Sequence, residues 1–173
     1  MALLEIHYLG DPLLRRMTRP VEFFDDELGR LVDDLMETMY AADGVGLAAP
    51  QVGDERRVTV IDVSERRDGT EAITLVNPTI VERRGMVESE EGCLSIPGVV
   101  ETIERAAEVV VEYRDPTGEP RKIEGAALLA RALQHEIDHL NGVLFIDHLG
   151  ALKRRLAVRE FRKAMEEKGL PVG

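Results

Sequence analysis

The sequence predicts an α+β fold: antiparallel or mixed β-sheets around a central helix that carries a His-Glu-x-x-His motif, with an N-terminal helix and a C-terminal helix. Apolar residues recur at helical spacing near the start of the chain and again in its last third, whereas short β-branched runs fill the region between. Most connections between these runs are too short for parallel crossovers, which favours antiparallel pairing. One helix, then strands, then two helices is the order of an α+β protein.

The elements are predicted as follows. Acidic residues at 25–27 and apolar residues three and four apart predict an amphipathic helix over 26–42, which Asp43-Gly44 ends. Turn signals at 67–69 and 115–118 separate short strands, which we predict over 58–63, 72–77, 86–90, 99–105, 108–113 and 121–123. Helical spacing returns over 126–140 and from about 149 to 168, and Gly169-Leu170-Pro171 ends the last helix.

Length and charge limit the class of protein. The 173 residues fit one catalytic domain, 1–173, with 148–170 as its C-terminal helix. A net charge of −11 argues against nucleic-acid binding over the whole surface. The single cysteine cannot form an internal disulfide, and we find neither a secretion leader nor an apolar run of about 18 residues. We therefore expect a cytoplasmic protein without membrane contact.

The strongest chemical motif is His135-Glu136-Ile137-Asp138-His139. It falls in the predicted helix 126–140, where positions i and i+4 share a face, so both imidazoles can bind one metal ion. Glu136 lies one step round the helix and can approach the open coordination position as a general base. Unrelated hydrolases share this pattern, and an exposed polar stretch of helix is the alternative.

A catalytic metal needs a third protein ligand, and its identity decides the class of enzyme. A metzincin would have a histidine at position 145, which is Phe145 here. A thermolysin-like endopeptidase would use a downstream glutamate, for which Glu160 is the well-spaced candidate although charges flank it. The remaining candidate is Cys93, which taken alone fits a small buried apolar side chain equally well.

We predict a glycine-rich loop directly after the first predicted helix, with the sequence Gly44-Val45-Gly46-Leu47-Ala48-Ala49-Pro50-Gln51. It lacks the Gly-Lys-Ser/Thr ending of a P-loop and follows no strand, so it does not indicate phosphate binding. It instead allows close approach of the backbone to a ligand, with the amide of Gln51 at its end.

Three segments taken in order resemble the signature motifs of peptide deformylases: 44–51, Glu91-Gly92-Cys93-Leu94-Ser95, and Gln134-His135-Glu136-Ile137-Asp138-His139-Leu140. The resemblance extends to the opening segment 7–14 and to the last helix, as in the bacterial form with a helical C-terminus. It implies a metal-dependent hydrolase that removes the N-formyl group from the N-terminal methionine of newly synthesised proteins and releases formate. A zinc endopeptidase and a structural metal site without catalysis are the alternatives.

The resemblance also implies roles for residues. Cys93, His135 and His139 would hold one divalent metal, with water as the fourth ligand. The expected ion is Fe²⁺, and Zn²⁺, Ni²⁺ or Co²⁺ could replace it. Glu136 would activate the metal-bound water, while the side-chain amide of Gln51 and the backbone N–H of Leu94 stabilise the oxyanion.

The substrate peptide would bind as an added strand along Val45, Gly46 and Gly92. Its methionine side chain would enter a pocket lined by Val45, Leu128, Arg131, Ala132 and His135. Arg131 replaces the apolar residue of some relatives, and Val100 stands where some have arginine.

Four further polar residues near these motifs receive no catalytic role. We expect His7 and His148 to be structural or solvent-facing, and Asp138 to be solvated or to support a ligand. Gln134 could brace a ligand or the region of Glu91.

The charge is unevenly distributed along the chain. Residues 148–168 hold seven Lys or Arg and three Glu, which leaves −15 on the other segments. By the resemblance, this basic helix would dock on the ribosome, where N-formylmethionyl nascent peptides emerge, and the protein would be a monomer. A solvated helix face is the alternative.

Overall fold

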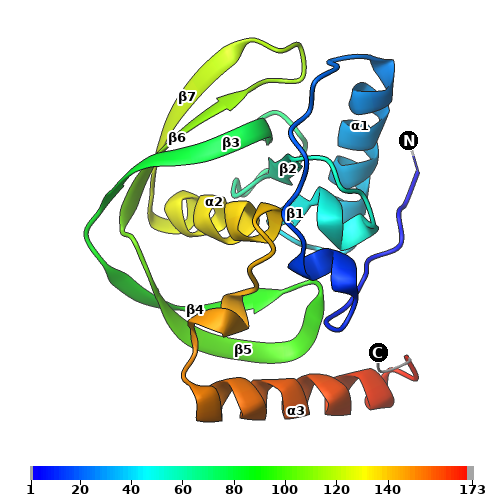
Figure 1. The fold of residues 1–173 in the computed structure, drawn as a ribbon, viewed down its shortest axis with the longest axis vertical. Coiled ribbons are helices and arrows are strands. Elements are labelled where there is room, and N and C mark those ends of the chain that lie inside the picture. The colour runs from blue at the N-terminus through cyan, green and yellow to red at the C-terminus, as the bar shows by residue number, and fades with distance from the viewer. Residues whose placement is uncertain (1, 171–173) are drawn as a thin grey trace.

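The computed structural model describes residues 2–170, and none of their helices is long and apolar enough to cross a membrane. A five-stranded sheet has the order β1-β2-β3-β6-β7, and β4 and β5 form a separate two-stranded sheet. The helix α2 lies between these two sheets, with α1 beside β1 and β2 and α3 beneath β5 (Figure 1). All pairings between the named strands are antiparallel, which confirms the predicted fold class.

The bounds of the elements agree with the sequence prediction in most places. The helices are α1 (Asp26–Ala41), α2 (Ala127–Leu140) and α3 (Ala151–Glu167). The strands are β1 (Gly46–Ala48), β2 (Val58–Ile61), β3 (Ile73–Arg84), β4 (Val87–Cys93), β5 (Ile96–Arg105), β6 (Glu108–Arg114) and β7 (Pro120–Ala126).

Three predicted boundaries were wrong. The run 72–77 continues to Arg84, because β3 passes a register shift after Val76 and keeps its pairing with β6. Part of the glycine-rich segment is not a loop, since β1 pairs with β2 and a 3₁₀ turn, η2 (Ala49–Val52), follows it. The last helix starts at Ala151 rather than at 148 or 149, because Phe145–His148 form a separate 3₁₀ turn, η3. The predicted end at Pro171 lies outside the described residues.

Apolar faces of the three helices hold the layers together. The side chain of Asp25 caps α1, and the buried face of this helix packs on β1 and β2. Leu133 and Ile137 of α2 are buried with strands of the large sheet. Phe161 and Met165 of α3 are buried against apolar residues of β5. Burial of a side chain of this size typically contributes about 1.5 to 3 kcal/mol, so α3 is an integral part of the core.

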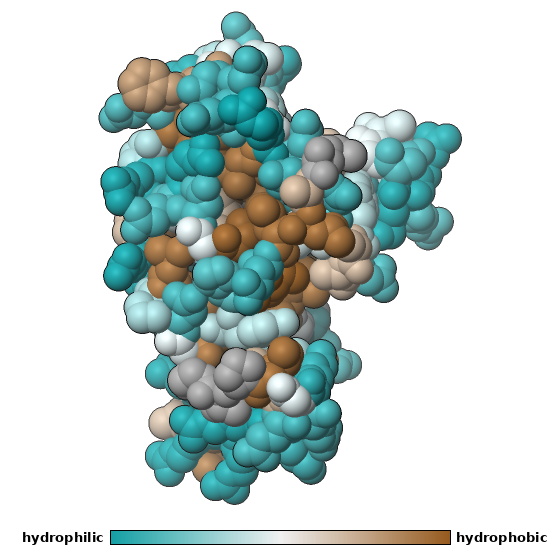
Figure 2. Space-filling model, turned by 90° about the vertical axis from the view of Figure 1, so that its right-hand side faces the viewer, coloured by the Kyte–Doolittle hydropathy of each residue, from teal (hydrophilic) through white to brown (hydrophobic). Residues whose placement is uncertain are grey.

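One face of the molecule shows how hydrophobic and hydrophilic residues are distributed on its surface (Figure 2). On the face in Figure 2, hydrophobic residues gather across the middle, and both ends of the molecule are hydrophilic. The lower end, where α3 lies in Figure 1, belongs to the hydrophilic part.

Candidate metal centre and active site

Three side chains that could bind one metal ion lie together between α2 and β4. The Sγ of Cys93 and one ring nitrogen from each of His135 and His139 lie within 4.8 Å of one another. His139 Nε2 is 3.3 Å from Cys93 Sγ and 3.2 Å from His135 Nε2. Ligand bonds of about 2.0 to 2.3 Å in a tetrahedral site put neighbouring ligand atoms about 3.3 to 3.6 Å apart. The three atoms therefore fit a single cation.

The secondary structure explains this convergence. His135 and His139 are four residues apart on α2, so their rings leave the same face of the helix. Cys93 is the last residue of β4, directly after a register shift in the pairing of β4 with β5. Such irregularities re-aim side chains at the ends of strands, often beside functional sites.

Both imidazoles direct a ring nitrogen at the cation site. The Nδ1–H of His135 donates to Glu91 Oε1 at 2.9 Å, so Nε2 is the ring nitrogen left to bind a cation. Burial would lower the pKa of His135, but hydrogen bonds with Cys93 and Glu91 outweigh burial and raise it well above its usual value, so a cation would displace the proton of Nε2. Burial lowers the pKa of His139 well below its usual value, and the neighbouring His135 and Arg105 lower it further. His139 is therefore neutral, and its Nδ1 has no hydrogen-bond partner among residues 2–170.

Glu91 is held as a carboxylate by a buried arginine. Arg105, with a side chain only 4% exposed, donates from Nε and Nη2 to the two oxygens of Glu91 at 2.8 and 2.9 Å. Burial would raise the pKa of Glu91, but the hydrogen bonds from Arg105 and His135 outweigh burial and lower it to about 2. A charged carboxylate thus fixes the orientation and tautomer of His135.

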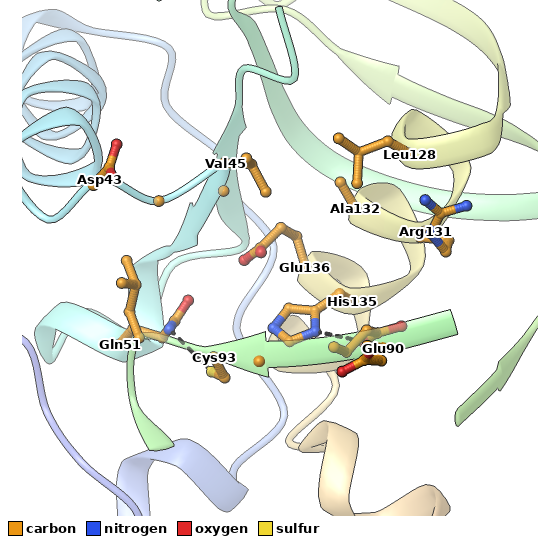
Figure 3. Close-up of a pocket in the computed structure, with 15 residues that line it drawn as sticks. Asp43, Val45, Gln51, Glu90, Cys93, Leu128, Arg131, Ala132, His135 and Glu136 are labelled. Carbon is orange, nitrogen blue, oxygen red and sulfur yellow. Dashed lines mark hydrogen bonds and ion pairs between the residues drawn. The ribbon is translucent and has the colours of Figure 1, made fainter. Parts of the chain in front are cut away.

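Glu136 is placed as an acid–base group. Its side chain is buried between α2 and β1 and points into the pocket, and Oε1 lacks a hydrogen-bond partner within residues 2–170 (Figure 3). Burial raises its pKa to about 7. Gly46 makes the room for this side chain, since a Cβ at that position would be 2.5 Å from Glu136 Oε2. The carboxyl group can therefore exchange protons with a molecule that enters the pocket.

Gln51 presents a fixed amide donor. Its Oε1 accepts the backbone N–H of Ala48 at 2.9 Å, which sets the orientation of the amide. Its Nε2 donates to Ser95 Oγ at 3.1 Å and points to Cys93 Sγ at 3.7 Å. The weak contact with sulfur leaves one N–H available for an oxygen atom beside the cysteine. Leu94, in the turn directly after β4, lines the same pocket.

A pocket of about 400 Å³ joins these groups (Figure 3). Every predicted site residue except His139 lines it, and His139 lies behind its wall. Val45 and Leu128 are 40% and 43% exposed and stand at its rim, whereas Ala132 is buried. The lining residues are Asp43, Gly44, Val45, Gly46, Gln51, Glu90, Glu91, Gly92, Cys93, Leu94, Leu128, Arg131, Ala132, His135 and Glu136.

Sequence reasoning missed the role of Arg105 and misjudged Gln134. Arg105 occupies an inward position of β5, in the alternation that also buries Val99 and Ile103, and a charge on such a face signals a buried partner. Gln134 supports neither a ligand nor Glu91. It lies one step along α2 from His135, and its amide bonds both backbone groups of Ala106 at 2.9 Å.

The family is decided by comparison with known proteins. The sequence model of the polypeptide deformylase family matches residues 3–155, which is most of the chain. The chain belongs to the polypeptide deformylase family. The deformylase of Acidobacterium capsulatum is 50% identical over 153 residues, covering 88% of this chain and 90% of the relative.

Solved deformylase structures have the same fold. The crystal structure of a peptide deformylase from Legionella pneumophila has a TM-score of 0.94 and 48% identity, covering 99% of this chain and all of the other. The Ehrlichia chaffeensis peptide deformylase in complex with actinonin has a TM-score of 0.88 and 40% identity, covering 94% of this chain and 98% of the other. The endopeptidase alternative finds no support, because Glu160 is exposed on α3, away from the two histidines.

Proposed function

We propose that this chain is a peptide deformylase that hydrolyses the formyl group from the N-terminal methionine of new proteins, with Cys93, His135 and His139 as its metal ligands. The convergence of one sulfur and two imidazole nitrogens beside a buried glutamate carries the proposal. We further propose that residues 1–173 act as one catalytic domain, as a monomer in the cytoplasm.

The three ligand atoms suit a divalent metal. A thiolate and two neutral imidazoles bind Fe²⁺, Zn²⁺, Ni²⁺ and Co²⁺, and we propose Fe²⁺ as the natural ion. When bound, the ion supplies a Lewis acid that lowers the pKa of a water molecule and polarises the formyl carbonyl. Glu91 supports this arrangement because it accepts the Nδ1–H of His135 and increases the basicity of the other ring nitrogen.

Glu136 moves the proton in this mechanism. Its Oε1, which has no hydrogen-bond partner among residues 2–170, accepts a proton from the attacking water, and the protonated carboxyl group then delivers it to the leaving nitrogen. Developing negative charge on the formyl oxygen is met by the N–H of Gln51 that contacts Cys93 Sγ only weakly, and by the backbone N–H of Leu94.

The rest of the pocket recognises the peptide. We propose that the peptide backbone adds as a strand along Val45, Gly46 and Gly92, beside the edge strand β1. The methionine side chain then enters between the rim residue Leu128 and the aliphatic stem of Arg131, with Ala132 at the floor.

The test is formate release from formyl-Met-Ala-Ser by protein loaded with Fe²⁺ without oxygen. Two matched variants, Glu136→Gln and Glu160→Gln, make the same chemical change at the buried carboxyl group and at an exposed one on α3. We expect Glu136→Gln to lose at least about 100-fold in kcat while retaining its metal, and Glu160→Gln to be unchanged. The proposal fails if the metal-loaded wild type releases no formate or if Glu136→Gln keeps the full rate.

We also propose that α3 docks on ribosomal RNA. The six basic side chains of α3 and that of Lys168, which follows it, are all exposed, and none forms an ion pair with another residue in the described part of the chain. Unpaired cations on one helix favour phosphate contacts that weaken with salt.

Deleting α3 would expose the core that Phe161 and Met165 close, so charge reversal is the better test of docking. The triple variant R155E/R159E/K163E should bind ribosomes at least about tenfold more weakly and still hydrolyse small formyl peptides. Unchanged ribosome binding would rule out this surface.

A further inference from the structure

Two polar residues beside the metal centre have no part in the proposed mechanism. Asp138 lies on α2, next to the ligand His139, and its side chain is only 22% exposed. His148 ends the turn η3 and lies three residues before Ala151, the first residue of α3. Both side chains meet at the buried guanidinium of Arg105.

Asp138 accepts two hydrogen bonds on one oxygen. Its Oδ2 is 2.6 Å from Arg105 Nη1 and 2.9 Å from His148 Nε2. These two nitrogens are 3.3 Å apart. Because Nε2 of His148 must carry its hydrogen to donate to the carboxylate, it cannot also accept from Arg105. The 3.3 Å approach therefore results from two donors that share one acceptor.

Arg105 connects this pair to the metal ligands. One side of its guanidinium donates to Asp138 on α2, and the other donates twice to Glu91 on β4. Glu91 in turn accepts the Nδ1–H of His135 and lies two residues before Cys93. The buried guanidinium of Arg105 thus connects β4, the strand that carries Cys93, to α2, the helix that carries both imidazoles.

The position of Arg105 depends on Asp138 having both of its donors. A planar guanidinium has a fixed fork, so a shift of its Nη1 end also moves the end that holds Glu91. Without His148, Asp138 Oδ2 has one donor fewer, and its 22% exposed side chain can turn to water. Arg105 would then lose the fixed carboxylate that sets its orientation from the α2 side.

We propose that Asp138 and His148 are positioning residues for the metal centre, acting through Arg105 and Glu91 on His135. The inference rests on the proposed metal role of Cys93, His135 and His139. It means that the segment leading into α3 takes part in setting metal affinity.

Anaerobic titration of the metal-free protein with Co²⁺ tests this, read by the thiolate-to-cobalt absorption band. His148→Phe keeps a ring but removes the donor, whereas His148→Gln keeps an N–H at a similar reach. His7→Phe is the matched control, because it removes another pairing between a histidine and an aspartate. Nδ1 of His7 is 2.6 Å from Asp11 Oδ2, and His7 contacts none of the metal ligands. All three changes are at partly exposed positions, so the fold should persist.

We expect His148→Phe to bind Co²⁺ about tenfold more weakly, at the lower end of the effect typical of residues that support a ligand. His148→Gln should return the affinity to within about threefold of the wild type, and His7→Phe should match the wild type. Equal affinity of wild type and His148→Phe, or no rescue by His148→Gln, would overturn this proposal alone. A wild type without a thiolate–cobalt band would overturn the metal centre and the positioning role with it.

Discussion

Replacing Gly46 with alanine should displace Glu136 and little else. A Cβ at this position would lie 2.5 Å from Glu136 Oε2, 2.8 Å from Cδ and 2.9 Å from Cγ. Real Cβ atoms essentially never come this close, so the carboxyl group and its stem must both move. The backbone of Gly46 has no positive φ, so the added methyl group introduces no conformational strain.

The size of the effect follows from these distances. Restoring an ordinary contact of about 3.4 Å moves Oε2 by about 0.9 Å. A misplacement of about 1 Å can cost about 100-fold in rate. We therefore expect Gly46→Ala to lower kcat for formyl-Met-Ala-Ser by about 100-fold, which corresponds to about 2.7 kcal/mol of transition-state stabilisation.

The assay compares steady-state formate release with metal content. Because the three atoms nearest to the added methyl group all belong to Glu136, Gly46→Ala should retain metal as the wild type does. Gly29→Ala is the control, since a Cβ at Gly29 in α1 meets nothing within 4 Å, and alanine favours the helix by up to about 1 kcal/mol. A wild-type kcat in Gly46→Ala would refute the placement of Glu136. Loss of metal would refute the claim that Glu136 can move without disturbing the metal ligands.

Three further predictions concern stability and metal. Burial and a hydrogen bond to Asp62 raise the pKa of Tyr40 to about 12; the folded state then holds this proton more tightly than the unfolded chain. The free energy of unfolding should fall as pH rises from about 10 to 12, and less steeply in Tyr40→Phe, measured by urea unfolding. Gln134→Leu leaves both backbone groups of Ala106 without partners and should lower that free energy by about 2 to 4 kcal/mol; a smaller loss would mean that water replaces the amide. Chelation should abolish formate release and lower the melting temperature, and Co²⁺ should restore both in the wild type but not in Cys93→Ala.

Local patterns in the sequence predict the parts of the site that depend on one element. The spacing of His135 and His139 predicts that their rings share a helix face, because the period of an α-helix is fixed. The same holds for the three helices, whose apolar spacing decides the buried face.

The sequence does not predict contacts that depend on register between distant elements. Arg105 reaches Glu91 and Asp138 across 14 and 33 residues, and these pairs form only because β4, β5 and α2 pack at one particular register. The sequence does not predict the strand β1 either. Its three residues are all buried, so they show no alternation of apolar and polar side chains, and only their pairing with β2 makes them a strand. Gln134 shows the limit within a helix, because one step along α2 from His135 turns its side chain to the backbone of Ala106, between β5 and β6.

The distance along the chain between Cys93 and the two histidines has a consequence for folding. The hairpin β4–β5 carries the sulfur and α2 carries both nitrogens, with β6 and β7 synthesised between them. A partly folded chain with only one of these units formed holds at most two ligands. High affinity for metal therefore arises only after slow, non-local contacts are complete, and metal uptake by a newly made chain can serve as a late reporter of its folding.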